Sequence, residues 1–488
     1  MGDFERVPAR DACFLAFERT ELHMHVGGVA IFEAGSLRLP SRMLDLERIR
    51  RYMTGCMESV PRCRQRIARV PFFGTVVWVD DAQFDIGRHV HLVRAPGAGT
   101  QADLQTIAGD IFSRPLDRQR PLWEFWFVDG LADRGRFAVV VKLHHCMTDG
   151  RASIEFMRRF LSTSPDVTFA DTEPPPYRPR PLPTDAALLR HEALRWLRAP
   201  AQLTRALGHL VRDPGARADL GAKLRGAAAT IWTVLRVTSR SSLNRRVGPN
   251  RRFAWTAIDM KDVRTLRARY GGSVDDAALG VLTGALERLF AAHSNDEHPT
   301  RLRVMAPTSA LTRQELQSLG NRVRAPLVTL PLWERSLDER MRRIQEEKEA
   351  LARHHQGLGW DVLMDVAEWA GTFSQQALMW LATRMRAYNV ILTLVPGPHF
   401  PLYLMGSKMV ELHPMLPLLD HQTVAVGVLR YMGRLHWGVV SAPEYAEFFP
   451  PLAQQIDASL SELLGSAHAT MLPSRRSASA TGAEADAT

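Results

Sequence analysis

The chain has little cysteine and no long apolar run, and these two absences narrow its class. Its 488 residues include 4 cysteines, without CxxC spacing, which is too few for the disulfide framework of a small secreted domain. The N-terminus lacks the basic region and apolar stretch of a signal peptide. No segment approaches the roughly 20 apolar residues of a membrane-spanning helix. We therefore expect a cytoplasmic protein that does not cross a membrane.

The composition is typical of a large globular protein. Hydrophobic residues make up 45% of the chain and charged residues 23%. A chain of this length exceeds the size at which one hydrophobic core keeps growing. The sequence therefore predicts two domains.

The net charge of +10 is concentrated in one segment, residues 185–252. This segment holds 14 Lys/Arg and 4 Asp/Glu, so the rest of the chain is near neutral. It is also amphipathic, with Ala193, Trp196 and Leu197 on a different arc from Arg195 and Arg198. No recognition motif for nucleic acid accompanies the charge, so we expect no nucleic-acid partner. Two interpretations remain open: a solvated helical face, or contact with an anionic membrane surface.

Runs of alternating or periodic apolar residues predict strands and helices on both sides of a proline-rich segment. We expect strands at 72–79, 137–143, 253–260, 302–306, 323–332, 423–431 and 435–440, and helices at 152–161 and 277–290. The prolines within 174–183 exclude helix and sheet interior and predict an extended linker. We therefore divide the chain into an N-terminal domain (1–172), a linker and basic helical connector (173–252), a C-terminal domain (253–465) and a disordered tail (466–488).

Two adjacent histidines, His144 and His145, end the predicted strand 137–143. Neighbouring side chains on a strand point to opposite faces, so only one of them faces a given substrate, and strand alternation places His145 with Leu143. A histidine with a pKa of about 6.5 is a suitable general base near pH 7. Asp149 either ion-pairs with an arginine or caps the next helix, and Gly150 permits close backbone approach. The competing interpretation is that the pair is structural, as adjacent histidines also occur by chance at 354–355.

Two His-x-His pairs, His23 with His25 and His89 with His91, each place two imidazoles on one strand face. This spacing can bind a metal, but the sequence offers no nearby cysteine or third ligand. We therefore expect packing histidines and no metal site.

The pattern His-His-x-x-x-Asp-Gly after a strand resembles the motif of the CoA-dependent acyltransferase superfamily, which includes chloramphenicol acetyltransferases and peptide-synthetase condensation domains. More of the chain resembles one branch, the bacterial wax ester synthase/diacylglycerol acyltransferases (WS/DGAT). The matching segments, in order, are residues 11–15, 23–28, 115–124 with their Pro-Leu-Trp, 243–244, 248–252, 319–323 and 395–398.

The resemblance implies a fold, a reaction and roles for residues. The fold would be α/β, with two chloramphenicol-acetyltransferase-like domains and the active site in a channel between them. The reaction would move a long-chain acyl group from acyl-CoA, a co-substrate rather than a bound cofactor, to diacylglycerol or a long-chain alcohol, giving triacylglycerol or wax ester. His145 would be the general base, with His144 and Asp149 beside it. The resemblance assigns structural support of the site to Gly150, Pro121, Leu122, Trp123, Asp276 and Asn321.

Two positions depart from the family pattern. Asp275 stands before Asp276 where the family has asparagine, and Leu394 replaces an asparagine before residues 395–398. Two rival functions therefore remain: a condensation or polyketide-associated acyltransferase, and a weakly active protein that binds lipid surfaces. A lipid substrate would favour peripheral attachment to the inner face of the plasma membrane or to lipid droplets.

Overall fold

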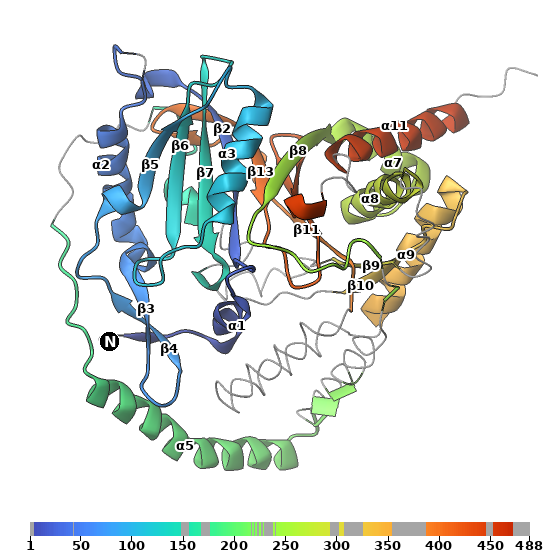
Figure 1. The fold of residues 1–488 in the computed structure, drawn as a ribbon. Helices are drawn as coiled ribbons and strands as arrows, with labels where there is room; N and C mark the ends of the chain where they lie inside the picture. The colour runs from blue at the N-terminus through green and yellow to red at the C-terminus, as the bar shows by residue number, and fades with distance from the viewer. Residues whose placement is uncertain are drawn as a thin grey trace, which may run out of the picture.

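The computed structural model describes most of both halves of the chain. The described residues are 4–41, 43–147, 156–166, 176–215, 217–218, 220–221, 224–225, 228, 238–239, 241–292, 302–306, 326–353, 387–445 and 452–471. Within them lie two six-stranded sheets and a small three-stranded sheet, with helices packed on the large sheets (Figure 1). The two sheet-rich halves agree with the α/β fold class expected from the sequence.

The first sheet belongs mainly to the N-terminal half and has the order β12-β13-β2-β7-β6-β5. Its strands are β2 (His25–Glu33), β5 (Val90–Arg94), β6 (Trp123–Asp129), β7 (Arg136–His144), β12 (Tyr403–Leu404) and β13 (Ser407–Met415). The small sheet, β1-β4-β3, comprises β1 (Glu5–Arg6), β3 (Gln65–Arg69) and β4 (Val76–Asp80). β7 is central, because it pairs antiparallel with both β2 and β6.

The second sheet forms the C-terminal half and has the order β10-β9-β11-β14-β15-β8. Its strands are β8 (Arg252–Asp259), β9 (Leu302–Met305), β10 (Leu327–Leu330), β11 (Val390–Val395), β14 (Val424–Tyr431) and β15 (Arg434–Ser441). β11 pairs in parallel with β9 and β14, and the other neighbours are antiparallel.

The longer helices cover these sheets and join them. They are α1 (Ala9–Phe17), α2 (Leu46–Cys56), α3 (Gln101–Ser113), α5 (Asp185–Arg212), α7 (Met260–Tyr270), α8 (Val274–Ala291), α9 (Leu337–Arg353) and α11 (Leu452–Met471). α2 packs on the face of the first sheet that carries Val139 and Val141, whereas α3 packs on the face that carries Val140 and also contacts β8. α7, α8, α9 and α11 contribute to the core of the second half. α3 therefore lies between the two halves.

β13 connects the halves directly, because it comes from the C-terminal part of the chain but pairs with β2 of the first sheet. Where it crosses β15, the backbone carbonyl of Pro414 lies so close to Gly438 that a Cβ built there would be 1.8 Å from the oxygen. Only glycine allows this approach. The two sheets are thus joined through an exchanged strand and a close backbone contact.

The proline-rich segment and the first turns of α5 pack along the small sheet. Arg180 forms an ion pair with Asp80 (Nη2 to Oδ1, 2.7 Å) in β4, and Tyr177 donates a hydrogen bond to the Arg64 carbonyl. Leu188 is buried against valines of the small sheet and the turn between β3 and β4. The described part of the linker, residues 176–184, contains neither helix nor strand.

Several predicted elements needed correction at their ends. The predicted strand 72–79 begins only at Val76, because Phe72 is almost fully exposed and has a φ of 62°, which belongs to a turn. α11 continues to Met471, into the segment 466–488 that the sequence analysis assigned to a disordered tail. Ala467 is buried there, one turn after the buried Leu463, so packing extends the helix. Residues 472–488 lie outside the described part of the chain.

Candidate active site

The two histidines lie where β7 meets a short turn. His144 is the last residue of β7 and pairs with His25 of β2, while His145 begins the 3-10 turn η5 (His145–Met147). Strand alternation therefore stops one residue before His145, and the alternation argument from the sequence does not fix its direction. A backbone hydrogen bond fixes the position of the residue instead, because its N–H donates to the Met24 carbonyl at 2.8 Å.

His144 is fully buried and contacts a carboxylate that the sequence analysis did not identify. Its Nε2 lies 3.5 Å from Oε2 of Glu18, the residue directly after α1. Its Nδ1 accepts a hydrogen bond from the N–H of Cys146 at 3.1 Å. Because Nδ1 is an acceptor, the ring proton of neutral His144 is on Nε2, facing Glu18. His144 thus connects Glu18 to the backbone of the turn that carries His145.

Arg118 holds Glu18 from the other side. Its Nε donates to Glu18 Oε2 at 2.8 Å, and its Nη2 donates to the Leu15 carbonyl at 3.1 Å. Burial alone would raise the pKa of the Glu18 carboxyl, but the adjacent His144 and the hydrogen bonds and charge of Arg118 outweigh this effect and lower the pKa to about 2. Glu18 is therefore ionised at neutral pH.

His145 packs against α1. Its ring stacks on Phe14, with centroids 3.7 Å apart and an interplanar angle of 10°. Burial is the main cause that lowers the pKa of His145 to about 4, with His144 adding to the effect. Its Nδ1 is buried and has no hydrogen-bond partner among the described residues. At pH 7 the imidazole is neutral, the form required of a base.

The Pro-Leu-Trp segment packs beneath this turn. The Leu122 carbonyl accepts from the His144 N–H at 2.9 Å, and the Pro121 carbonyl accepts from the Trp123 N–H at 3.0 Å. Trp123 is fully buried, and its indole N–H donates to the Cys63 carbonyl at 2.8 Å. This segment therefore supports the strand end that carries His144.

The remaining predicted site residues do not come together with the histidines among the described residues. Asp276 lies in the first turn of α8, where it forms a reciprocal capping pair with Ser273 and an ion pair with Lys348 of α9. Asp149, Gly150 and Asn321 lie outside the described residues. For Asp276 the observed contacts are those of a helix cap.

Only one of the two His-x-His pairs is close to the site. His23 and His25 are buried, stack on each other, and have potential ligand atoms near one oxygen of Glu18. Arg118 already binds Glu18, and the positive charges of Lys142 and Arg251 act on these imidazoles, which disfavours a cation.

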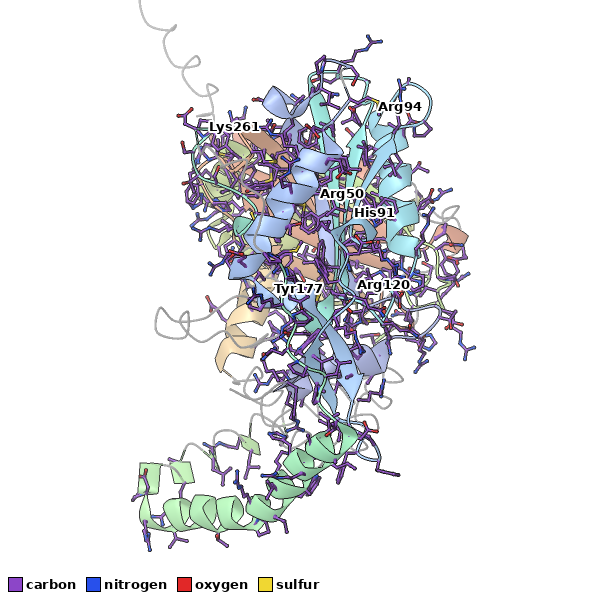
Figure 2. All side chains as sticks on the ribbon, turned by 90° about the vertical axis from the view of Figure 1, so that its left-hand side faces the viewer. Arg50, His91, Arg94, Arg120, Tyr177 and Lys261 are labelled. Carbon is purple, nitrogen blue, oxygen red and sulfur yellow. The ribbon has the colours of Figure 1, made fainter. Side chains whose placement is uncertain are left out.

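The other pair packs on aromatic rings. Nδ1–H of His89 donates to the Trp123 carbonyl (2.8 Å), and the imidazole stacks on the Trp123 ring. His91 stacks on Trp126. Figure 2 shows His91 on the same side of the molecule as Arg50. These contacts are those of packing histidines.

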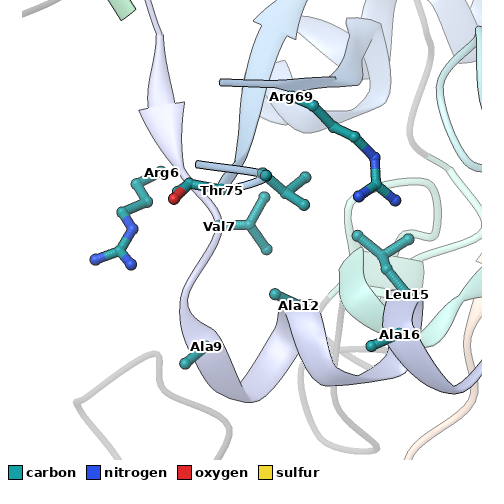
Figure 3. Close-up of a pocket in the computed structure, with 10 residues that line it drawn as sticks. Arg6, Val7, Ala9, Ala12, Leu15, Ala16, Arg69 and Thr75 are labelled. Atoms are coloured by element: carbon teal, nitrogen blue, oxygen red, sulfur yellow. The ribbon is translucent and has the colours of Figure 1, made fainter. Parts of the chain in front are cut away.

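Two cavities flank the region. One lies between α1 and the small sheet and is lined partly by Arg6, Leu15 and Arg69 (Figure 3). The other is a small gap in the core between the first sheet and α2. All of its lining residues are apolar: Ala30, Phe32, Met53, Phe125, Phe127, Val139, Val141, Met157, Phe160, Leu161 and Leu404.

This combination of two sheet-rich halves and a histidine pair at a strand end defines an acyltransferase of the CoA-dependent type. Residues 8–278 match the wax ester synthase/diacylglycerol acyltransferase catalytic domain, and residues 319–464 match the WS/DGAT C-terminal domain. The chain therefore belongs to the WS/DGAT family.

Individual relatives agree with this assignment. A probable diacylglycerol O-acyltransferase of Mycobacterium tuberculosis is 26% identical over 475 residues, which cover 96% of this chain and 97% of that protein. A putative diacylglycerol O-acyltransferase of the same species is 28% identical and covers 94% of this chain and 90% of that protein.

Solved structures show the same fold. A wax ester synthase/diacylglycerol acyltransferase from Marinobacter aquaeolei aligns with a TM-score of 0.64 and 23% identity, over 95% of this chain and 99% of that one. A starter condensation domain of rhizomide synthetase, solved with C8-CoA, aligns with a TM-score of 0.57 and 10% identity, over 96% of this chain and 95% of that one. Both comparisons support the two-domain acyltransferase fold.

Proposed function

We propose that this acyltransferase moves a long-chain fatty acyl group from acyl-CoA to diacylglycerol or to a long-chain alcohol, with His145 as the general base. The products would be triacylglycerol or wax ester, together with free CoA. The family assignment and the names of the relatives support the substrates. The observation that carries the role of His145 is its geometry: a neutral imidazole stacked on Phe14, in a turn whose N–H groups donate to the Met24 carbonyl and to Nδ1 of His144.

In the proposed reaction, His145 accepts the proton of the acceptor hydroxyl while the oxygen attacks the thioester carbonyl. The tetrahedral intermediate collapses, the C–S bond breaks, and the CoA thiolate leaves with the proton that His145 returns. Because the imidazolium would be poorly solvated in this half-buried position, returning the proton quickly is favourable. General base catalysis of this kind contributes roughly 10²- to 10⁴-fold in rate.

The neighbouring residues would support the base. His144 would hold the turn through Cys146, and Pro121, Leu122 and Trp123 would hold the strand end. Asp149 and Gly150 would continue the support on the other side of the turn, while Asp276 and Asn321 would act from the C-terminal half. These roles make His145 the one group expected to touch the reacting atoms.

The small apolar gap beside β7 would widen to admit the hydrocarbon chain of the acyl group. It is lined only by apolar side chains, and its wall includes Val139 and Val141 of the strand that leads to His145. A pocket without polar groups suits an alkyl chain, since no hydrogen bond is lost on filling it.

The decisive assay uses labelled palmitoyl-CoA with either diacylglycerol or hexadecanol, and compares the wild type with His145→Ala. We expect ester from the wild type and a loss of roughly 10²-fold or more in the variant. Full activity in the variant would exclude His145 as the base. If neither protein formed ester while both bound lipid vesicles, the protein would instead be a lipid-surface binder.

We also propose that α5 attaches the protein peripherally to an anionic lipid surface, the inner leaflet of a plasma membrane or a lipid droplet. No described helix is both long and apolar enough to span a bilayer. α5 projects from the rest of the molecule (Figure 2), and its apolar residues Trp196 and Leu197 are 41% and 75% exposed. Leu188 and Glu192 are the buried side chains by which α5 contacts the rest of the protein. Trp196 and Leu197 therefore face outward, as do Arg190 and Arg198.

Flotation with vesicles tests this attachment. We expect more protein with anionic vesicles than with neutral ones, and less for the double variant Trp196→Ser, Leu197→Ser. Trp333→Ser, which removes a tryptophan 55% exposed in the C-terminal half, is the matched control. Equal recovery with both vesicle types would exclude electrostatic attachment.

A further inference from the structure

Three side chains with metal-binding atoms meet where the exchanged strand β13 crosses the second sheet. Glu411 and His413 come from β13, and His436 comes from β15. One ligand atom from each side chain lies within 4.8 Å of the other two. The Nε2 of His413 is 2.8 Å from Oε2 of Glu411, and the rings of His413 and His436 are 5.0 Å apart. The cluster thus draws its ligands from two different sheets.

The two imidazoles are buried without enough hydrogen-bond partners. His413 is 1% exposed and His436 is 0% exposed. Nδ1 of His413 and both ring nitrogens of His436 form no well-aligned hydrogen bond among the described residues, although backbone groups of Trp437 and Tyr431 lie near the two rings. Leaving buried polar atoms unpaired is costly, so such groups in a folded core require an explanation. A bound ion would supply the missing partner.

The charges around the cluster permit a cation. Arg136 lies 3.9 Å from Oε1 of Glu411, but its closer partner is Asp133 at 3.1 Å. Arg434 acts on the cluster electrostatically, yet it forms its own ion pair with Asp259 at 3.1 Å. Glu411 therefore remains as the carboxylate available to the two imidazoles. At the first cluster, in contrast, Glu18 is already bound by Arg118.

The cluster is open to solvent on one side only, because both imidazoles are buried. Glu411 is 25% exposed, so one side of the cluster is open to solvent.

We propose that Glu411, His413 and His436 bind a divalent first-row transition-metal ion, such as Zn²⁺, with solvent as a further ligand. Two imidazoles and one carboxylate form a common ligand set for these ions. The ion would join β13 to β15 and so fasten the strand that the C-terminal half contributes to the first sheet. The role is structural, and it does not depend on the proposed reaction.

The test uses the full chain without a polyhistidine tag, stripped of metal with a chelator. Titration with Zn²⁺, followed by calorimetry, should show one tight site, and Co²⁺ should give visible d–d absorption bands from imidazole coordination. Zn²⁺ should also raise the melting temperature of the wild type. Glu411→Gln retains the size of this partly exposed side chain, so we expect the variant to keep its fold. It should bind Zn²⁺ at least tenfold more weakly than the wild type does.

Two further variants make the result decisive. His436→Asn should abolish the tight site, whereas His91→Asn, which changes a histidine packed on Trp126, should bind Zn²⁺ as the wild type does. Absence of a tight site in the wild type overturns the proposal. So does wild-type affinity in both Glu411→Gln and His436→Asn, or loss of the site in His23→Gln alone, which would place the metal beside Glu18.

Discussion

The imidazole of His145 lies almost parallel to the ring of Phe14, at a centroid distance of 3.7 Å. This contact joins the first helix of the chain to the turn after β7, and with the Met24 hydrogen bond it orients the proposed base. Phe14→Leu removes the stacked ring but retains an apolar side chain. We expect kcat to fall roughly 3- to 10-fold, because that factor corresponds to the energy of one aromatic pair. KM should change little.

Steady-state kinetics at saturating acyl-CoA measures this effect. Phe17→Leu is the matched control, since Phe17 lies on the same helix and packs partly in the core behind α3. Equal losses of kcat in both variants would mean that α1 matters for stability and not through the stacked ring.

The pH dependence of the reaction should reflect the buried environment of His145. Burial lowers the pKa of this imidazole to about 4, so the base stays neutral from pH 8 to about pH 5. We expect kcat/KM to be flat over that interval and to fall as the pH approaches 4. A fall centred near 6.5, the pKa of an exposed histidine, would contradict the assignment.

Protonation of His145 should also affect stability. The unfolded chain binds this proton near pH 6.5 and the folded protein only near 4. Since the unfolded state binds more protons in between, the free energy of unfolding should fall as the pH drops through that window. Circular dichroism at each pH measures the folded fraction, so a loss of folded protein can be distinguished from the fall in kcat/KM.

Glu18→Gln should destabilise the protein in a pH-dependent way. The carboxyl has a pKa of about 2 in the folded protein, against 4.5 for an ordinary glutamate, because of His144 and Arg118. The ionised Glu18 carboxylate therefore makes its full contribution to the free energy of unfolding above about pH 4.5. This contribution is lost as the pH falls towards 2. The size is on the order of 3 kcal/mol at neutral pH.

Urea unfolding of the wild type and Glu18→Gln from pH 7 to pH 3 measures this contribution. The difference between the two proteins should shrink as the pH falls. Glu47→Gln, at a side chain that is 76% exposed, should show almost no difference at any pH. A penalty for Glu18→Gln that does not change with pH would indicate a loss of packing and not of charge.

Filling the apolar cavity should shorten the preferred acyl chain. Ala30 of β2 lines the cavity and is almost fully buried, so Ala30→Leu places three more carbons in the space. We expect the ratio of activity with palmitoyl-CoA to that with octanoyl-CoA to fall several-fold. The ratio is independent of the folded fraction, and an unchanged ratio would place the acyl chain elsewhere.

Gly438→Ala should weaken the contact between β13 and β15. A Cβ at this position would lie 1.8 Å from the Pro414 carbonyl, and backbone cannot rotate away. We expect a loss of about 1–3 kcal/mol or more in unfolding free energy. Gly55→Ala is the control, because nothing lies near its Cβ on α2, and it should stabilise by about 1 kcal/mol. Similar effects in both variants would refute the close crossing.

Local sequence patterns predicted the elements but not the contacts between them. The Val-rich run before His144 predicted β7, and the leucines at spacings of three and four predicted α8, because burial of one face is encoded within each segment. Glu18 was not found, because its partners His144 and Arg118 lie at least 100 residues away and a lone glutamate after a helix has no signature.

The same limit applies to the second half. Glu411 and His413 are two residues apart on β13, but His436 reaches them only because β13 crosses to the first sheet. Nothing in the strand pattern of residues 407–415 indicates which sheet it will join. The sequence identified Leu394 as a departure from the family pattern but not its surroundings, and in the fold this side chain is half-buried against the C-terminal core.

The exchange of β13 has a consequence for any attempt to divide the gene. A fragment that stops in the proline-rich linker would encode β2 without its outer neighbour, leaving a nine-residue edge, His25–Glu33, with free amides and carbonyls. Such an unprotected edge recruits other strands and promotes aggregation. The two fragments, produced together, would instead complement each other through β13, so the protein is suited to a split reporter but not to expression of isolated halves.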